Sequence, residues 1–215
     1  MQLKKKTVIF DLDGVICFTD KFHYQAWKAL ADRLGIYFDE VINNRLRGVS
    51  RMASLDIILE QSDKEYTQEE KNAFAAEKND TYRELLKNMN PADLTDEVRD
   101  TLVELRSRGY KLTIGSSSKN TKFILEQIGL GDFFDAIADG TDITHSKPDP
   151  EVFLISAQKI GVAPGDCVVV EDAKSGIQAA KAAGMTALAL LGDAKDCGLE
   201  DYNLTTFSDL LNILP

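Results

Sequence analysis

The stretch from Thr7 to Gly14 constrains the fold of this chain more than any other segment. Its first four residues are β-branched or aromatic, and Asp11 and Asp13 follow them one residue apart. Side chains alternate along a strand, so the two carboxyl groups start on the same face. Gly14 then lets the backbone turn sharply. Because open α/β sheets bind ligands at the carboxyl ends of their strands, the stretch predicts a buried strand that delivers two carboxylates to a ligand site.

An Asp-x-Asp pair at the end of a strand also has a simpler interpretation, because aspartate commonly forms turns. Two carboxylates held close together in a buried site repel each other unless a cation or a proton is present. The choice between these interpretations depends on whether later strands also end in polar groups, and they do.

Composition excludes several classes of function. The chain has 215 residues, enough for one α/β core and a modest second domain. Its net charge of −10 argues against a nucleic-acid or anionic-membrane partner, since no basic surplus is available to neutralise phosphates. Cys17, Cys167 and Cys197 are odd in number and form no close pair, which indicates reduced thiols. No segment resembles a signal peptide or has the length of a membrane span, and we therefore expect a cytoplasmic protein.

Residues from about 17 to 88 show helical periodicity and no strand pattern. The first helix ends at Gly35, and two further helical segments lie between residues 41 and 59. Residues 67–70 have the form of a capping box that begins a long polar helix. This block predicts an all-helical domain inserted after the first strand.

Strands and helices alternate after residue 88, joined by short connections. The predicted strands are 111–115, 136–138, 167–170 and 186–191, and the predicted helices are 96–108, 122–128, 150–160 and 175–183. Such alternation predicts a parallel sheet with right-handed crossovers. The predicted fold class is α/β, with a doubly wound, Rossmann-like parallel-sheet core formed by residues 1–16 and 89–215. Residues 17–88 form the inserted all-helical cap domain.

Polar side chains follow several of the predicted strands, either at the carboxyl end or in the next loop. They are Asp11 with Asp13, Ser116 with Lys119 and Asn120, Lys147, and Glu171 with Asp172. Each group alone has an ordinary explanation as a turn, a helix cap or a solvated surface charge. Together they converge on one edge of one sheet. Carboxylates on two strands supply the oxygen ligands that Mg²⁺ requires, and the hydroxyl, amide and ammonium donors can surround a phosphoryl group.

The order and spacing of these groups resemble the four motifs of the haloacid dehalogenase-like phosphotransferases, at Asp11-Leu12-Asp13-Gly14, Ser116, Lys147 and Glu171-Asp172. The resemblance covers the whole chain. Further segments resemble the bacterial β-phosphoglucomutase branch of that superfamily: His23-x-x-x-Trp27, Arg47-Gly48-Val49-Ser50-Arg51 with Ser54, Lys78-Asn79-Asp80, Ser118-Lys119-Asn120, and Ser175-Gly176-Ile177-Gln178 after Glu171-Asp172.

The resemblance implies a division of roles in the core. Asp11 would be the nucleophile that carries an aspartyl-phosphate, and Asp13 the general acid and base for the sugar hydroxyl. Ser116 and Lys147 would bind the oxygens of the transferring phosphoryl. Mg²⁺ would be held by Asp11, the backbone carbonyl of Asp13, Glu171 and Asp172.

The resemblance also implies a set of substrate-binding residues: His23, Trp27, Gly48, Arg51, Ser54, Lys78, Ser118, Lys119 and Asn120. Arg51, together with residues 118–120, would clamp the phosphate that is not being transferred. His23 and Lys78 would help position Asp13, and Trp27 would line the substrate cavity.

Some of these residues have structural interpretations that the sequence leaves open. Trp27 lies on an apolar helix face, where core residues are common. His23 could be a structural histidine, Arg51 could simply begin a helix, and His145 is taken as structural. Phe18 is a departure from the family, which usually has aspartate immediately before the hinge threonine, here Thr19.

The activity implied by the resemblance is the interconversion of β-D-glucose 1-phosphate and D-glucose 6-phosphate through a glucose 1,6-bisphosphate intermediate. Another β-hexose 1-phosphate remains a possible substrate. The alternative is a Mg²⁺-dependent sugar-phosphate phosphatase with the same nucleophile. A non-catalytic binding or regulatory protein on the same fold would be favoured if a core motif were degraded, and no motif is degraded. We expect a monomer that acts on a small sugar phosphate.

Overall fold

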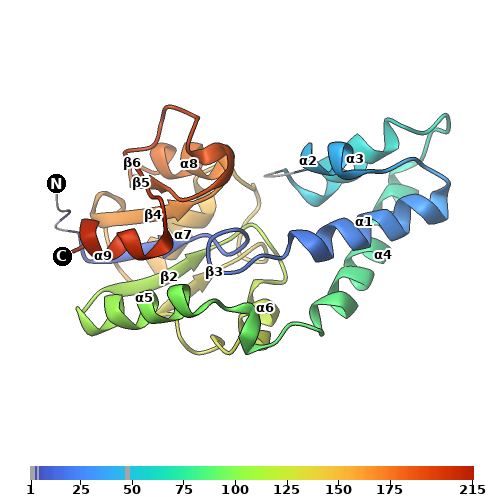
Figure 1. Cartoon of the computed structure of the whole chain (residues 1–215). Helices are drawn as coiled ribbons and strands as arrows, with labels where there is room; N and C mark the ends of the chain where they lie inside the picture. Colours follow the sequence, from blue (N-terminus) through green and yellow to red (C-terminus); the bar gives the residue numbers. More distant parts are fainter. Residues whose placement is uncertain (1–2, 4, 47–48) are drawn as a thin grey trace. The chain divides into compact units, whose positions relative to one another are not determined.

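The computed structural model describes residues 3, 5–46 and 49–215. The chain divides into two compact units (Figure 1). The core unit comprises Met1–Phe18 and Asn90–Pro215, and the helical unit comprises Thr19–Met89. The bounds of the cap domain proposed from the sequence, residues 17–88, are close to those of the helical unit.

The core unit contains a fully parallel sheet in the order β3-β2-β1-β4-β5-β6. Its strands are β1 (Thr7–Phe10), β2 (Lys111–Gly115), β3 (Ala136–Ala138), β4 (Cys167–Glu171), β5 (Thr186–Ala189) and β6 (Tyr202–Asn203). The predicted α/β class with a parallel sheet is confirmed. The predicted strand 186–191 is two residues too long, because the chain turns away at Gly192, whose φ is 61°.

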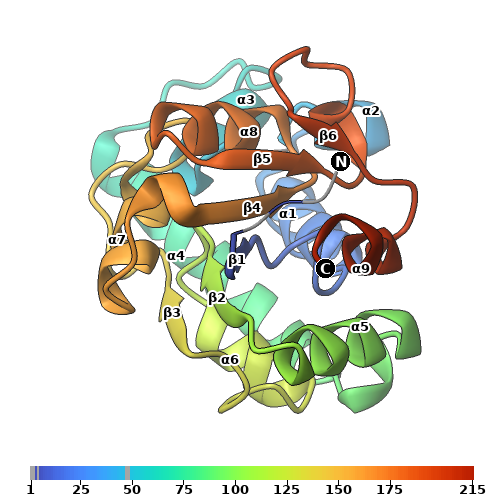
Figure 2. The ribbon, with the colours of Figure 1, turned by 90° about the vertical axis from the view of Figure 1, so that its left-hand side faces the viewer.

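Helices cover both faces of this sheet (Figure 2). They are α5 (Asp96–Ser107), α6 (Thr121–Gln127), α7 (Glu151–Lys159), α8 (Lys174–Ala182) and α9 (Leu210–Ile213), with short 3₁₀ helices η1 (Pro91–Asp93), η2 (Pro164–Asp166), η3 (Gly192–Ala194) and η4 (Phe207–Asp209). On one face Ile9 joins a buried cluster with Phe153 of α7 and Ile177 of α8. On the other, Phe10 stacks on Phe207 with the ring centroids 5.6 Å apart. A fully buried side chain of this size stabilises the fold by about 1.5–3 kcal/mol.

The central position of β1 fixes where the predicted site must lie. β1 pairs with β2 on one side and β4 on the other, and the N–H of Asp11 extends the second pairing by donating to Val170 O at 3.0 Å. The chain then turns at Gly14, whose φ of 86° favours glycine. Asp11 therefore leaves the strand beside the end of β4, where Glu171 and Asp172 also emerge.

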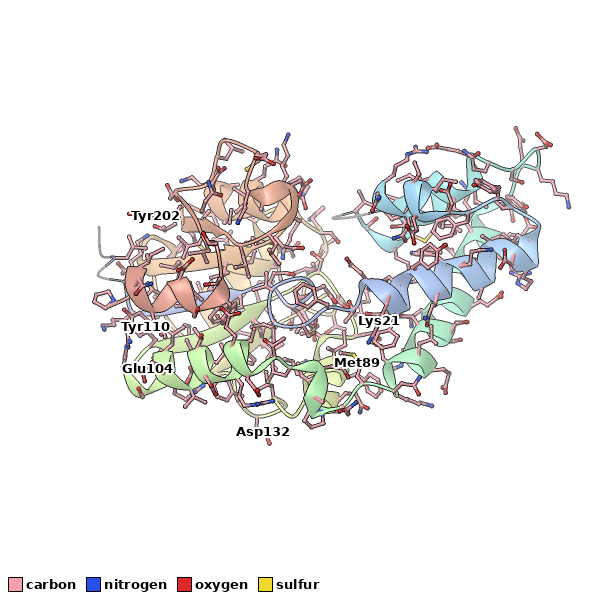
Figure 3. The ribbon with its side chains drawn as sticks, viewed as in Figure 1. Lys21, Met89, Glu104, Tyr110, Asp132 and Tyr202 are labelled. Atoms are coloured by element: carbon pink, nitrogen blue, oxygen red, sulfur yellow. The ribbon has the colours of Figure 1, made fainter. Side chains whose placement is uncertain are left out.

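The helical unit consists of four described α-helices: α1 (Asp20–Leu34), α2 (Glu40–Asn44), α3 (Arg51–Leu59) and α4 (Gln68–Leu86). The predicted helix end at Gly35 is confirmed, with φ of 72° at that residue. The predicted capping box at Thr67 and Glu70 is also confirmed at the start of α4. Lys21 and Met89, labelled in Figure 3, lie in the first turn of α1 and at the last residue of this unit. None of the described helices is long and apolar enough to cross a membrane.

Candidate active site

Three acidic side chains meet at the carboxyl ends of β1 and β4. One carboxylate oxygen from each of Asp11, Glu171 and Asp172 lies within 4.8 Å of the other two. Asp11 and Glu171 are buried and Asp172 is half-buried. Oxygen-only donor sets of this kind suit hard divalent cations, so this cluster can hold a metal ion.

Lys147 brings a positive charge to the same cluster from the loop between β3 and α7. Its Nζ lies 2.5 Å from Asp11 Oδ1 and 2.5 Å from Glu171 Oε1. The same Nζ lies over the ring of Phe153, 4.7 Å from its centroid. The lysine side chain is 8 % exposed, so water screens these two ion pairs little.

Burial and like charges shift the acidity of this cluster. Desolvation is the largest cause that raises the pKa of Asp11 to about 7; Lys147 opposes the shift and the carboxylates of Glu171 and Asp13 add to it. Desolvation, followed by the charges of Glu171 and Asp11, raises the pKa of Asp172 to about 9. Burial disfavours the ammonium of Lys147, but the two paired carboxylates outweigh this and raise its pKa above the usual value. A bound cation would favour the carboxylate forms.

The remaining oxygen of Glu171 is held by the backbone. Its Oε2 accepts hydrogen bonds from the N–H groups of Asp172 at 2.9 Å and Ala173 at 3.0 Å. With Oε1 on Lys147, the carboxylate is fixed at both ends. Asp13 is half-buried directly before the turn at Gly14, and it forms an isolated parallel bridge with Cys17.

The segment after β2 forms a tight turn in which serine hydroxyl groups accept hydrogen bonds from the backbone. Ser116 is 2 % exposed, and its Oγ accepts from the N–H of Ser118 at 3.2 Å. Ser118 Oγ in turn accepts from the N–H of Asn120, also at 3.2 Å. Asn120 is buried, whereas Lys119 is exposed.

The loop after β3 supports this turn, and sequence reasoning missed it. The N–H of Gly140 donates to Ser118 O at 3.0 Å, and a Cβ at Gly140 would overlap Ser117 O. The buried carboxylate of Asp139 orders the loop by accepting from the N–H of Thr141 at 2.8 Å. An Asp-Gly pair directly after a short strand was the available signal.

Within the helical unit, a buried lysine joins several of the predicted substrate-binding residues. Lys78 of α4 is 2 % exposed, and its Nζ lies 2.9 Å from Nδ1 of His23. The same Nζ lies 4.7 Å from the ring centroid of Trp27 and 4.6 Å from that of Tyr82. The His23 ring stacks on Tyr82 with centroids 4.1 Å apart.

His23 is neutral in this environment. Desolvation is the largest cause that lowers its pKa well below 6.5, and the charges of Lys78 and Arg51 add to it. A neutral ring can accept a hydrogen bond from the Lys78 ammonium at Nδ1 and keep its proton on Nε2. Trp27 belongs to the hydrophobic core of the helical unit. This position agrees with its interpretation as a core residue.

The other predicted residues of this unit lie on α3 or just before it. Arg51 is the first residue of α3 and is half-buried, which lowers its pKa. Ser54, one turn further, is 4 % exposed. Gly48 lies outside the described residues.

Comparisons with known proteins show the family of the chain. A family model described as haloacid dehalogenase-like hydrolase matches residues 5–184. A β-phosphoglucomutase of Bacillus subtilis is 42% identical over 185 residues, covering 85% of this chain and 82% of the relative. A fructose-1-phosphate phosphatase of Escherichia coli is 37% identical and covers 84% of this chain and 94% of the relative.

A solved structure shows the same fold. The crystal structure of a β-phosphoglucomutase from Clostridium difficile aligns with a TM-score of 0.87 at 38% identity, covering 96% of this chain and 93% of that one. The carboxylates and lysine described above lie within the segment that the family model matches. The chain therefore belongs to the haloacid dehalogenase-like hydrolase family and is similar to its β-phosphoglucomutases.

Proposed function

We propose that this enzyme interconverts β-D-glucose 1-phosphate and D-glucose 6-phosphate through an aspartyl-phosphate and a glucose 1,6-bisphosphate. The observation that carries the proposal is the buried cluster in which Lys147 bridges Asp11 and Glu171 at 2.5 Å each. The 42% identity to a β-phosphoglucomutase supports the choice of substrate.

The chemistry assigns different tasks to Asp11 and Asp13. A carboxylate oxygen of Asp11 attacks phosphorus, and the bond from phosphorus to the sugar oxygen breaks as Asp13 supplies a proton to that oxygen. In the reverse half-reaction Asp13 takes the proton of the accepting hydroxyl while the phosphoryl group leaves Asp11. Lys147 stabilises the negative charge that gathers on the transferring group, and Ser116 offers a hydroxyl to its oxygens.

We propose Mg²⁺ as the cofactor, held by Asp11, the backbone carbonyl of Asp13, Glu171 and Asp172. Carboxylate and carbonyl oxygens are the donors that this ion prefers. When bound, Mg²⁺ would neutralise charge on the carboxylates and the phosphoryl oxygens. This charge neutralisation also explains how three carboxylates within 4.8 Å of one another can serve as anions.

A mutase needs a second anion site for the phosphate that is not transferred. We propose Arg51 with Ser118, Lys119 and Asn120 for this role. The Arg51 guanidinium can bind phosphate in a bidentate manner. We propose that His23, whose neutral ring keeps a proton on Nε2, and Lys78 bind near the substrate and help position Asp13. The resemblance to β-phosphoglucomutases supports Trp27, Gly48 and Ser54 as further substrate-binding residues.

A coupled assay tests the proposal. The enzyme is mixed with β-glucose 1-phosphate, Mg²⁺ and a catalytic amount of glucose 1,6-bisphosphate, and glucose 6-phosphate is followed with a dehydrogenase. We expect turnover with the β-anomer and little with the α-anomer. Release of inorganic phosphate without formation of glucose 6-phosphate would overturn the mutase assignment.

The second candidate function is a sugar-phosphate phosphatase. The 37% identity to a fructose-1-phosphate phosphatase favours it, because the nucleophile and cofactor would be unchanged. In that reaction water, rather than a sugar hydroxyl, would take the phosphoryl group from Asp11. Parallel measurement of phosphate release from fructose 1-phosphate and glucose phosphates separates the two.

A further inference from the structure

Three glycines from separate segments border the acidic pair Glu171 and Asp172. They are Gly14 in the turn after β1, Gly176 in the first turn of α8, and Gly192 at the start of η3. At each one, a Cβ atom would overlap an atom of the acidic pair. The carboxylates of Asp172 and Glu171 therefore occupy space that exists because Gly14 and Gly176, respectively, have no side chain, whereas the atom that a Cβ at Gly192 would overlap is the backbone carbonyl oxygen of Asp172.

Gly176 makes the closest of these approaches. A Cβ at this position would overlap Oε1 and Cδ of Glu171 and lie 2.6 Å from its Cγ. The obstruction involves the whole end of the glutamate rather than one atom. No small adjustment of Gly176 relieves it, because α8 packs against β4 and β5 and its face at Ile177 is fully buried.

Backbone conformation does not explain glycine at position 176. The residue lies within the helix α8 (Lys174–Ala182), where alanine is more favourable than glycine. Gly14 and Gly192 differ in this respect, since their φ values of 86° and 61° would favour glycine whatever surrounded them. At Gly176, therefore, the effect of adding a Cβ beside Glu171 can be measured without a change in backbone conformation.

The contacts of Glu171 show which interactions a Cβ at Gly176 would disrupt. One oxygen pairs with Lys147 at 2.5 Å and the other accepts from two backbone N–H groups. A side chain pushed aside by a Cβ cannot keep both sets of contacts, because they lie at opposite ends of one planar carboxylate. Lys147 would then lose one of its two anionic partners and shift relative to Asp11.

We propose that Gly176 is a positioning residue for Glu171, and that Gly14 makes room for the carboxylate of Asp172 in the same way, while Gly192 makes room for the Asp172 backbone carbonyl. By lacking a Cβ, Gly176 holds the Glu171 carboxylate in the orientation that pairs with Lys147 and faces the proposed metal site. The metal part of this inference rests on the proposed function, whereas the steric part does not.

A double-mutant cycle on thermal stability tests the steric part. Gly176→Ala is made in the unmodified protein and in the Glu171→Ala variant, and melting temperatures are measured by circular dichroism. We expect Gly176→Ala to lower the melting temperature of the unmodified protein. In the Glu171→Ala background, where the obstructing atoms are gone, it should leave the temperature unchanged or raise it, because alanine favours the helix.

The control is Gly165→Ala. A Cβ at Gly165, in η2 of the same unit, would meet no atom within 4 Å. Equal losses from Gly176→Ala in both backgrounds would overturn the inference. If Gly176→Ala alone fails to fold while the double variant folds, the steric role is supported.

Binding of Mg²⁺ by calorimetry, without substrate, tests the metal part. Gly176→Ala should weaken binding on the order of 10- to 100-fold, the range for residues that orient metal ligands, and Gly165→Ala should not. Unchanged affinity in Gly176→Ala would overturn this part of the inference. Failure of the unmodified protein to bind Mg²⁺ would instead overturn the proposed metal site, and the stability cycle would still decide the steric role.

Discussion

The ammonium group of Lys147 lies 2.5 Å from the carboxylate of Asp11, and their side chains are 8% and 10% exposed. Lys147 approaches from a loop more than a hundred residues later in the chain than Asp11. The pair therefore depends on the packing of the core unit. Each charge compensates the other in a buried site where one charge alone would destabilise the fold.

Removing the charge of Lys147 should destabilise the fold. We expect Lys147→Met to lower the free energy of unfolding by about 3–5 kcal/mol at pH 8, because it leaves two buried carboxylates without their cationic partner. The loss should be smaller at pH 5: an acid whose pKa is raised in the fold binds protons more tightly there than in the unfolded chain, so stability falls as pH rises.

Urea unfolding at the two pH values measures this effect. The control is Lys87→Met, which breaks the exposed Lys87–Glu84 pair and should change stability by less than about 1 kcal/mol. Similar losses for the two variants would show that the Lys147 pair is not the stabilising contact.

Asp11→Asn should abolish turnover without unfolding the protein. The amide has nearly the shape of the carboxylate and keeps an oxygen for Lys147, but it cannot form the acyl phosphate that the mechanism requires. We expect kcat to fall by a factor on the order of 10⁴ or more, with the melting temperature maintained. Retention of about a tenth of the activity or more would contradict the mechanism as a whole.

Binding of Mg²⁺ should become tighter between pH 6 and pH 8. The pKa values of Asp11 and Asp172, about 7 and about 9, mean that protons must leave before the carboxylates can serve as ligands. Each proton displaced gives up to about a tenfold gain in affinity per pH unit. Calorimetry in buffers of different ionisation enthalpy counts the protons released, and the absence of any release would contradict the assignment of these ligands.

His23 should make the stability of the protein fall below pH 6.5. Its pKa is lowered in the fold, so the unfolded chain binds its proton more readily, and stability is present above 6.5 and decreases as the pH falls. The decrease is at most about 1.4 kcal/mol per pH unit.

His23→Gln provides the comparison, because it removes the titrating ring and keeps a polar side chain of similar size. In denaturant unfolding between pH 7 and pH 5, we expect the free energy of unfolding of this variant to decrease less than that of the unmodified protein, because the contribution of His23 is absent. The control is His145→Gln, which replaces the other histidine, 71% exposed. Parallel curves for His23→Gln and the unmodified protein would argue against a His23 that is neutral in the fold.

Arg51→Ala should separate mutase activity from simple hydrolysis. We expect kcat/KM for β-glucose 1-phosphate to fall roughly 10- to 100-fold, the value of a charge-assisted pair of hydrogen bonds, because mutase turnover places one phosphate in the distal site. Hydrolysis of a small aryl phosphate uses only the transfer site and should change little. Arg45→Ala, which removes an exposed arginine paired with Glu60, is the control. Equal losses on both substrates would remove Arg51 from the distal site.

Much of the fold was predictable because its signals are local. The strand at Lys111–Gly115 and the helix end at Gly35 follow from a short run of apolar residues and from one glycine. The end of β5 was not predictable, since Leu190 and Leu191 continue the apolar run while the chain already turns at Gly192. β6 and α9 contain only two and four residues, too few to show a period.

The candidate site, like the fold, has some features that local sequence predicts and others that depend on tertiary structure. The sequence by itself determined that Asp11 and Glu171 end buried strands of a parallel sheet, because alternation and hydrophobicity are properties of short segments. Only the tertiary structure decided that Lys147 pairs with both carboxylates and that Gly176 leaves room for Glu171. Ion pairing and steric exclusion act over a few ångströms between segments far apart in the chain, and no local pattern of residues records those distances.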